Sequence, residues 1–104
     1  MMRKDSSQTT KDFVRVHIFV EGRVQGVGFR YFTLQKANLL GITGWVRNTY
    51  RGEVEILAED TRPKLETLIG NLRQGPGGSF VSNLRIEWLD ATEEFDRFSV
   101  ISSN

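Results

Sequence analysis

The sequence of 104 residues contains no cysteine and only one histidine, His17. Without cysteine the chain can form no disulfide, no thiolate metal site and no cysteine nucleophile. A single imidazole also leaves no means of building a multi-histidine metal site. The apolar runs are only a few residues long, whereas a membrane helix needs roughly 20. We therefore expect a protein that holds no metal or other cofactor and does not associate with a membrane.

The sequence also lacks an excess of charge of either sign. The 14 lysine and arginine residues nearly balance the 13 aspartate and glutamate residues, which leaves a formal net charge of +1. Proteins that coat nucleic acid carry a much larger positive excess, so no nucleic-acid partner is expected. The length suits one domain. We expect a flexible polar tail over residues 1–12 without a secretory signal, then a single domain over residues 13–104 in a cytoplasmic monomer.

Hydrophobic periodicity predicts the order of the secondary structure. Residues 13–21 alternate in polarity and predict a strand, and residues 29–40 repeat at helical spacing up to Gly41. Two further strands are expected over residues 42–48 and 53–58, joined by a short hairpin loop. A second helix, capped by Asp60 or Thr61, would bury a stripe made of Leu65, Leu68, Ile69 and Leu72. Alternation around residues 84–88 and 98–100 predicts a fourth strand and a short last one.

This order predicts an α+β fold of the ferredoxin-like βαββαβ type. Such a sandwich has an antiparallel sheet with two helices on one face, here with a short C-terminal strand added. We expect Glu53 and Glu55 to be solvated and His17 to be structural or on the surface. The two tryptophans, Trp45 and Trp88, are expected in the core. Because this fold hosts many unrelated functions, the function has to be found in a site.

The segment from Gly22 to Arg30 interrupts both periodicities between the first strand and the first helix. Its glycines allow successive backbone N–H groups to point inward, and the helix that follows adds partial positive charge. Together these features predict an anion site, which Arg30 could clamp from the first helical turn. The segment is not a Walker A loop, which would end in Gly-Lys-Ser/Thr, because Gly28 is followed by Phe29 and Arg30. It is not a dinucleotide-binding fingerprint either, because position 31, which would need a glycine, is Tyr31. A plain glycine-rich turn is the simpler alternative.

Asn48 is the second candidate. It ends a predicted strand just before the hairpin loop. Its amide offers both a donor and an acceptor, which could orient a water molecule. Asparagine is also common as a turn-capping residue, and the residue pattern by itself favours that simpler role.

Two motifs in this order are similar to the paired signatures of the acylphosphatase family. The first is Gly22-Arg23-Val24-Gln25-Gly26-Val27-Gly28-Phe29-Arg30, and the second is Gly44-Trp45-Val46-Arg47-Asn48-Thr49. The resemblance extends over residues 14 to about 100. It implies a small enzyme that hydrolyses acyl phosphates to carboxylate and inorganic phosphate, without a metal or a covalent phosphoenzyme. Inorganic phosphate, as the product, is then an expected inhibitor.

The resemblance also implies roles for individual residues. Arg30 would bind the phosphate together with the loop amides, and Asn48 would orient the attacking water, which reverses the simpler interpretation of Asn48. The cradle would consist of Arg23, Val24, Gln25, Gly26, Val27, Gly28 and Phe29. One alternative is a non-catalytic module that binds phosphate or a phosphoanhydride. An RNA-recognition domain has the same element order, but the acidic third strand and the low net charge disfavour it.

Overall fold

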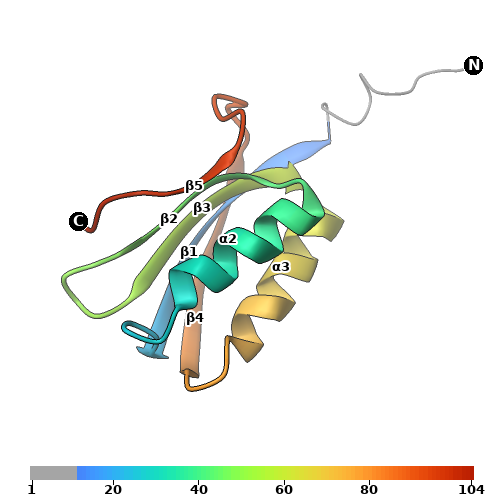
Figure 1. The fold of residues 1–104 in the computed structure, drawn as a ribbon. Helices are drawn as coiled ribbons and strands as arrows, with labels where there is room; N and C mark the ends of the chain where they lie inside the picture. The colour runs from blue at the N-terminus through green and yellow to red at the C-terminus, as the bar shows by residue number, and fades with distance from the viewer. Residues whose placement is uncertain (1–11) are drawn as a thin grey trace, which may run out of the picture.

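A computed structural model describes residues 12–104, so the predicted tail, apart from Asp12, lies outside the described residues. The predicted βαββαβ order and the short last strand are both confirmed (Figure 1). The elements are β1 (Phe13–Arg23), α2 (Phe29–Leu40), β2 (Thr43–Asn48), β3 (Val54–Thr61), α3 (Arg62–Gln74), β4 (Phe80–Asp90) and β5 (Phe98–Val100). Among the described residues, no helix is long and apolar enough to cross a membrane.

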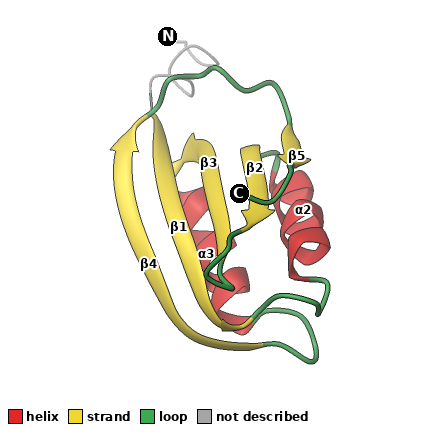
Figure 2. Ribbon diagram, turned by 90° about the vertical axis from the view of Figure 1, so that its left-hand side faces the viewer, coloured by secondary structure: helices red, strands yellow, loops and turns green. Residues whose placement is uncertain are grey.

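The strands form one sheet in the order β4-β1-β3-β2-β5. Every pairing is antiparallel except that of β2 with β5, which is parallel. The four strands of the βαββαβ core thus form the predicted antiparallel sheet, and the added C-terminal strand β5, whose direction was not predicted, makes the sheet mixed. The reason is the connection after β4, which crosses to the opposite edge of the sheet before β5 begins (Figure 2). Alternation in a sequence reports which face a side chain takes and not the direction of a strand.

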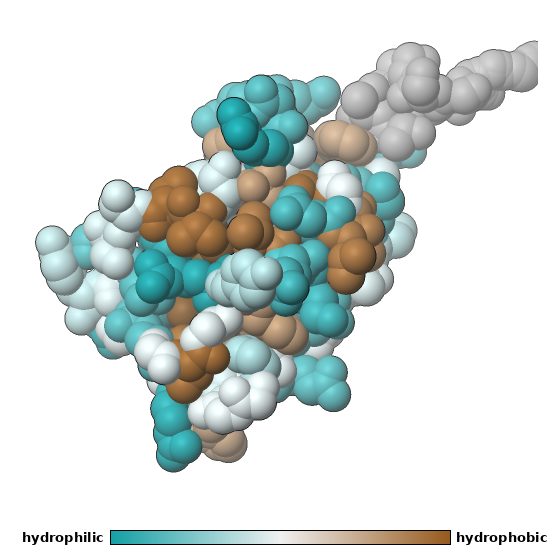
Figure 3. All heavy atoms as spheres, viewed as in Figure 1, coloured by the Kyte–Doolittle hydropathy of each residue, from teal (hydrophilic) through white to brown (hydrophobic). Residues whose placement is uncertain are grey.

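Both helices lie on the same face of the sheet, as predicted (Figures 1 and 2). The core fills the space between the two layers, and its centre is the cross-strand pair of Ile18 and Ile56, both fully buried. All four residues of the predicted α3 stripe are buried. On the solvent side of the helices, hydrophobic residues form separate patches between hydrophilic ones (Figure 3). The helical spacing of the apolar residues predicts this arrangement, in which one stripe of each helix is buried and the opposite side is mixed in polarity.

The helix ends follow the sequence signals in part. Gly41 has a φ of 74° and donates its N–H to carbonyl oxygens of the last turn of α2, which confirms it as the terminating glycine. Thr61 is the N-cap of α3 but makes no side-chain capping bond. The Asp60 carboxylate accepts the Thr61 N–H instead, at 2.7 Å. β3 also runs to Thr61, past the predicted end at residue 58.

The open face of the sheet carries a network of ion pairs, which corrects the expectation that Glu53 and Glu55 are solvated. Both carboxylates are buried. Glu55 accepts hydrogen bonds from Arg47 at 2.8 Å and from His17 at 2.7 Å. Glu53 pairs with Arg85 at 2.7 Å. Acidic residues on a strand surface are usually exposed, and here paired cations make their burial tolerable.

The tryptophans differ from one another. Trp88 packs against the edge of the core, and the Arg62 guanidinium lies 4.0 Å from the centre of its ring. Trp45 is adjacent to buried Val46 on β2, so its side chain lies on the open face, where Arg47 stacks 4.8 Å from its ring centre. The expectation that both belong to the core was therefore wrong for Trp45.

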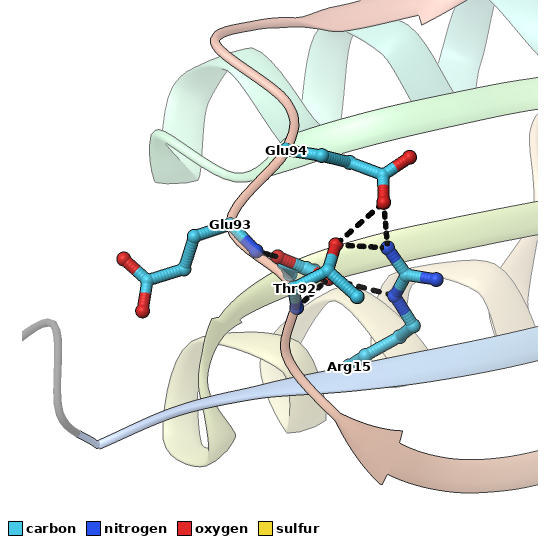
Figure 4. Close-up of polar contacts among 5 residues, drawn as sticks. Arg15, Thr92, Glu93 and Glu94 are labelled. Carbon is cyan, nitrogen blue, oxygen red and sulfur yellow. Dashed lines mark hydrogen bonds and ion pairs between the residues drawn. The ribbon is translucent and has the colours of Figure 1, made fainter.

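The most enclosed carboxylate of this face is Glu59, which is only 1% exposed. It accepts hydrogen bonds from the Arg15 Nε at 2.7 Å and from the N–H groups of Thr92 and Glu93. Figure 4 labels the three residues that donate these bonds. Burial alone would raise the pKa of the Glu59 carboxyl. The hydrogen bonds from Thr92, Arg15 and Glu93 outweigh burial and hold the pKa below its ordinary value of 4.5.

Because folding lowers the pKa of the Glu59 carboxyl, the free energy of unfolding depends on pH in the acidic range. The unfolded chain binds a proton at Glu59 more readily than the folded chain, so the contribution is complete above pH 4.5 and is lost as the pH falls through the folded pKa. Glu59→Gln should lower the free energy of unfolding at neutral pH by about 1–3 kcal/mol and flatten its acid dependence. Urea unfolding at neutral and acidic pH measures both, with the exposed Glu66→Gln as the control. Equal acid slopes in Glu59→Gln and the unmodified protein would contradict the assignment.

Candidate active site

The strand topology brings the two candidate motifs together. β1 and β2 both pair antiparallel with β3, so they run in the same direction on either side of it. Val20 of β1 and Asn48 of β2 are both register partners of Val54. The loop that follows β1 and the residue that ends β2 therefore lie at the same end of the sheet.

The glycine loop has the backbone conformation that its composition predicts. Gly26 and Gly28 have φ values of 74° and 78°, in the left-handed region that other residues rarely adopt. Gly28 is the N-cap of α2, which has no side-chain cap and no acidic residue in its first turn. The first N–H groups of a helix have no partner within the helix, and no side chain caps them here. This end of α2 carries partial positive charge and can accept an anion.

The Gln25 side chain fixes the loop against the β2–β3 hairpin. Its Nε2 donates to the carbonyl oxygens of Thr49 and Glu53, at 2.9 and 2.8 Å. The hairpin is in turn stabilised by Thr49, whose hydroxyl oxygen lies 3.3 Å from the N–H groups of Arg51 and Glu53. The amide of Gln25 therefore holds the two motifs at a fixed distance from each other.

Arg30 differs from the arginines of the open face. Arg15, Arg47 and Arg85 each pair with a buried carboxylate. Within residues 12–104, no acidic side chain lies within 4.0 Å of the Arg30 guanidinium. Its position in the first turn of α2 places a permanent positive charge beside the helix N-terminus. The charge of Arg30 is thus available to an anion bound there.

Asn48 contributes a polar atom that the fold leaves without a partner. Its Oδ1 is buried and has no hydrogen-bond partner among the described residues. Its backbone is fixed, because its carbonyl oxygen accepts the N–H of Asn104 at 3.1 Å. The turn-capping role goes to the Thr49 hydroxyl instead. A buried polar atom without a partner costs stability and is uncommon, which marks this position as a candidate for function.

These groups surround one pocket of about 290 Å³. The predicted site residues that line it are Val24, Gly26, Gly28, Phe29, Arg30 and Asn48. Val24 and Phe29 are almost completely buried, so they offer little surface of their own to a ligand. Three residues of the predicted cradle do not line it: Arg23 is exposed at the end of β1, Gln25 contacts the hairpin, and Val27 packs against the core.

Two further lining residues, Tyr31 and Val100, were missed by the sequence analysis. Tyr31 follows Arg30 in the first turn of α2, so its closeness to the predicted anion site could have indicated it. Val100 reaches the pocket only because β5 pairs in parallel with β2, where Val100 is the partner of Val46. No local pattern in the sequence reveals that pairing.

Within the described part of the chain, no three histidine, aspartate or glutamate side chains are arranged to hold a metal ion. Within residues 12–104, no carboxylate and no histidine line the pocket. Its hydrogen-bonding groups include backbone amides, a guanidinium and a carboxamide. This set can bind an anion and orient a small polar molecule beside it.

Comparisons with known proteins agree with the motifs. The family model described as Acylphosphatase matches residues 16–100. A curated acylphosphatase of Pelotomaculum thermopropionicum is 45% identical over 86 residues, which are 83% of this chain and 94% of that protein. A crystal structure of acylphosphatase from Bacillus subtilis is 38% identical with a TM-score of 0.82, and covers 85% of this chain and 98% of that one. An acylphosphatase structure from Coxiella burnetii is 37% identical with a TM-score of 0.85, at 91% and 99% coverage.

Proposed function

This chain belongs to the acylphosphatase family, hydrolases that act on acyl phosphates, and from that premise we propose that the loop and helix end around Arg30 bind the phosphoryl group while Asn48 orients the attacking water. The observation that carries the proposal is the single pocket in which Gly26, Gly28, Arg30 and Asn48 meet. The chemistry of acyl phosphates fits such a site. They are activated mixed anhydrides with a good carboxylate leaving group, so positioning and charge stabilisation suffice for catalysis.

The phosphoryl oxygens bind to donors that the fold has already oriented. The left-handed conformation of Gly26 and Gly28 allows successive loop amides to point into the pocket, and the first turn of α2 adds N–H groups without a side-chain cap. Arg30 supplies two parallel N–H donors and a full positive charge. Donors that are fixed before the reaction stabilise charge on the equatorial oxygens as it develops in the transition state. Gln25 contributes indirectly, because it holds the loop in register with Asn48.

Water attacks phosphorus in line with the bond that breaks. The Asn48 carboxamide, which belongs to a residue that lines the pocket, binds that water and directs a lone pair of the water toward phosphorus. The bond from phosphorus to the carboxylate oxygen breaks, and the carboxylate leaves with the bonding electrons. Since neither a carboxylate nor an imidazole of the described residues lines the pocket, the proton of the water passes to a phosphoryl oxygen.

The experiment that tests this function is the hydrolysis of benzoyl phosphate by the purified chain in EDTA, across mildly acidic and neutral pH. We expect turnover that survives chelation, no limb in the pH–rate profile from a protein base, and inhibition by inorganic phosphate. Turnover that EDTA abolishes would overturn the metal-free mechanism. Phosphate binding without any turnover would support the non-catalytic module instead.

Several sequence-based expectations stay proposals beside this one. They are the single domain over residues 13–104, the monomeric state, the cytoplasmic location and the lack of a nucleic-acid partner. Size-exclusion chromatography with light scattering measures the oligomeric state directly.

A further inference from the structure

The pocket has two chemically different parts. One part consists of Gly26, Gly28, Arg30 and Asn48 and is polar. The other consists of Tyr31 and Val100, whose side chains are 64% and 43% exposed. The remaining lining residues belong to the core. Tyr31 and Val100 are therefore the apolar side chains that a molecule in the pocket can reach from solvent, and we refer to them as the apolar rim.

The two residues of the apolar rim are held by separate elements. Tyr31 lies in the first turn of α2, directly after the arginine proposed to bind phosphate. Val100 lies on β5, whose parallel register with β2 places it beside Val46. The N–H of Ile101, the next residue, donates to the Val46 carbonyl oxygen at 2.9 Å, which fixes the end of β5. Both side chains thus border the pocket on regular backbone.

An acyl phosphate is a short molecule whose two halves share one oxygen. When the phosphoryl group lies on the polar part, the acyl group has to lie within a few ångströms of it, toward the mouth of the pocket. We propose that the apolar rim of Tyr31 and Val100 holds this acyl group and selects apolar, and above all aromatic, acyl phosphates. The inference rests on the proposed function and names its substrate class.

Electrostatics strengthens the selection. Among the residues that the structure describes, Arg30 is the only charged side chain that lines the pocket, and the phosphoryl group occupies it. An acyl group that carries an ammonium or a second carboxylate therefore finds no partner at the rim, and its desolvation is not compensated. An aromatic ring can instead pack against the ring of Tyr31 in an offset or edge-to-face arrangement.

The test compares two substrates that differ only in the acyl group, benzoyl phosphate and acetyl phosphate. Tyr31→Ala should lower kcat/KM for benzoyl phosphate about tenfold, mainly through KM, because hydrophobic contacts of this size discriminate by roughly that factor. The acetyl group offers only one methyl group for contact with the rim, so acetyl phosphate should change by less than about twofold. Tyr31→Phe should retain the unmodified values, and Val100→Ala should show a smaller loss in the same direction.

The matched control is Leu39→Ala, an 81% exposed apolar side chain of α2 that does not line the pocket. It should leave both substrates unchanged. Equal losses for both substrates in Tyr31→Ala, or no loss for either, would overturn the inference while leaving the proposed function in place. Failure of the unmodified protein to hydrolyse either substrate would overturn the proposed function itself, and this inference with it.

Discussion

Replacing Arg30 with alanine is expected to lower kcat/KM for an acyl phosphate by about a hundredfold to a thousandfold and to abolish inhibition by inorganic phosphate. Removal of one preorganised donor at a developing charge typically costs a factor of this size. The fold should survive, because Arg30 leaves no acidic partner unpaired among residues 12–104 and alanine favours the helix. Steady-state kinetics with phosphate as inhibitor, beside a thermal melt, measure both quantities.

Two further variants separate charge from geometry at this position. Arg30→Lys keeps a positive charge but loses the planar pair of donors, so we expect activity between that of Arg30→Ala and that of the unmodified protein. Arg73→Ala, which removes an exposed arginine from the last turn of α3, should leave kinetics unchanged. If Arg73→Ala reduced activity as much as Arg30→Ala, the loss would reflect overall charge, and the assignment of Arg30 would be wrong.

Asn48→Ala is expected to lower kcat by about a hundredfold or more while phosphate inhibition persists. The amide is proposed to orient water and not to hold the phosphoryl group, so its loss should act on the rate and leave phosphate affinity nearly unchanged. Stability should stay the same or rise slightly, because the buried Oδ1 has no partner in the described structure and its removal relieves a desolvation cost. Activity and chemical denaturation of the same preparation provide the comparison.

The control for this variant is Asn38→Ala, which truncates an exposed asparagine of α2. It should change neither kcat nor stability. A turn-capping role for Asn48 predicts the opposite pattern, namely a loss of stability with kcat retained. That pattern would show that the amide supports the hairpin and takes no part in the reaction.

Local sequence signals predicted those parts of the site that depend on neighbouring residues. The anion site depends on residues that are adjacent in the sequence, namely glycines directly before a helix and an arginine in its first turn. The loop could therefore be located before the fold was known. The helices were predicted for the same reason, because the spacing of apolar residues reports a face directly.

Features that depend on strand order and register could not be predicted in this way. Glu55 looks like a surface residue in the sequence, and its burial follows from His17 and Arg47 on the two strands that flank it. The parallel direction of β5 depends on a connection that crosses the sheet. The contribution of Val100 to the pocket depends on the same connection. Alternation identifies the face of a strand but not its neighbours.

The parallel pairing of β5 also determines when the pocket can form. The loop, α2 and Asn48 all come from the first half of the chain, whereas Val100 and the Asn104 N–H that binds the Asn48 carbonyl come from its last residues. Contacts between residues so distant in sequence form late, because a long segment must be ordered first. Because the ribosome synthesises the protein from its N-terminus onward, the glycine loop and Arg30 emerge early. Val100, on the other side of the pocket, emerges late. The pocket of a nascent chain therefore lacks its Val100 side until β5 has emerged and docked.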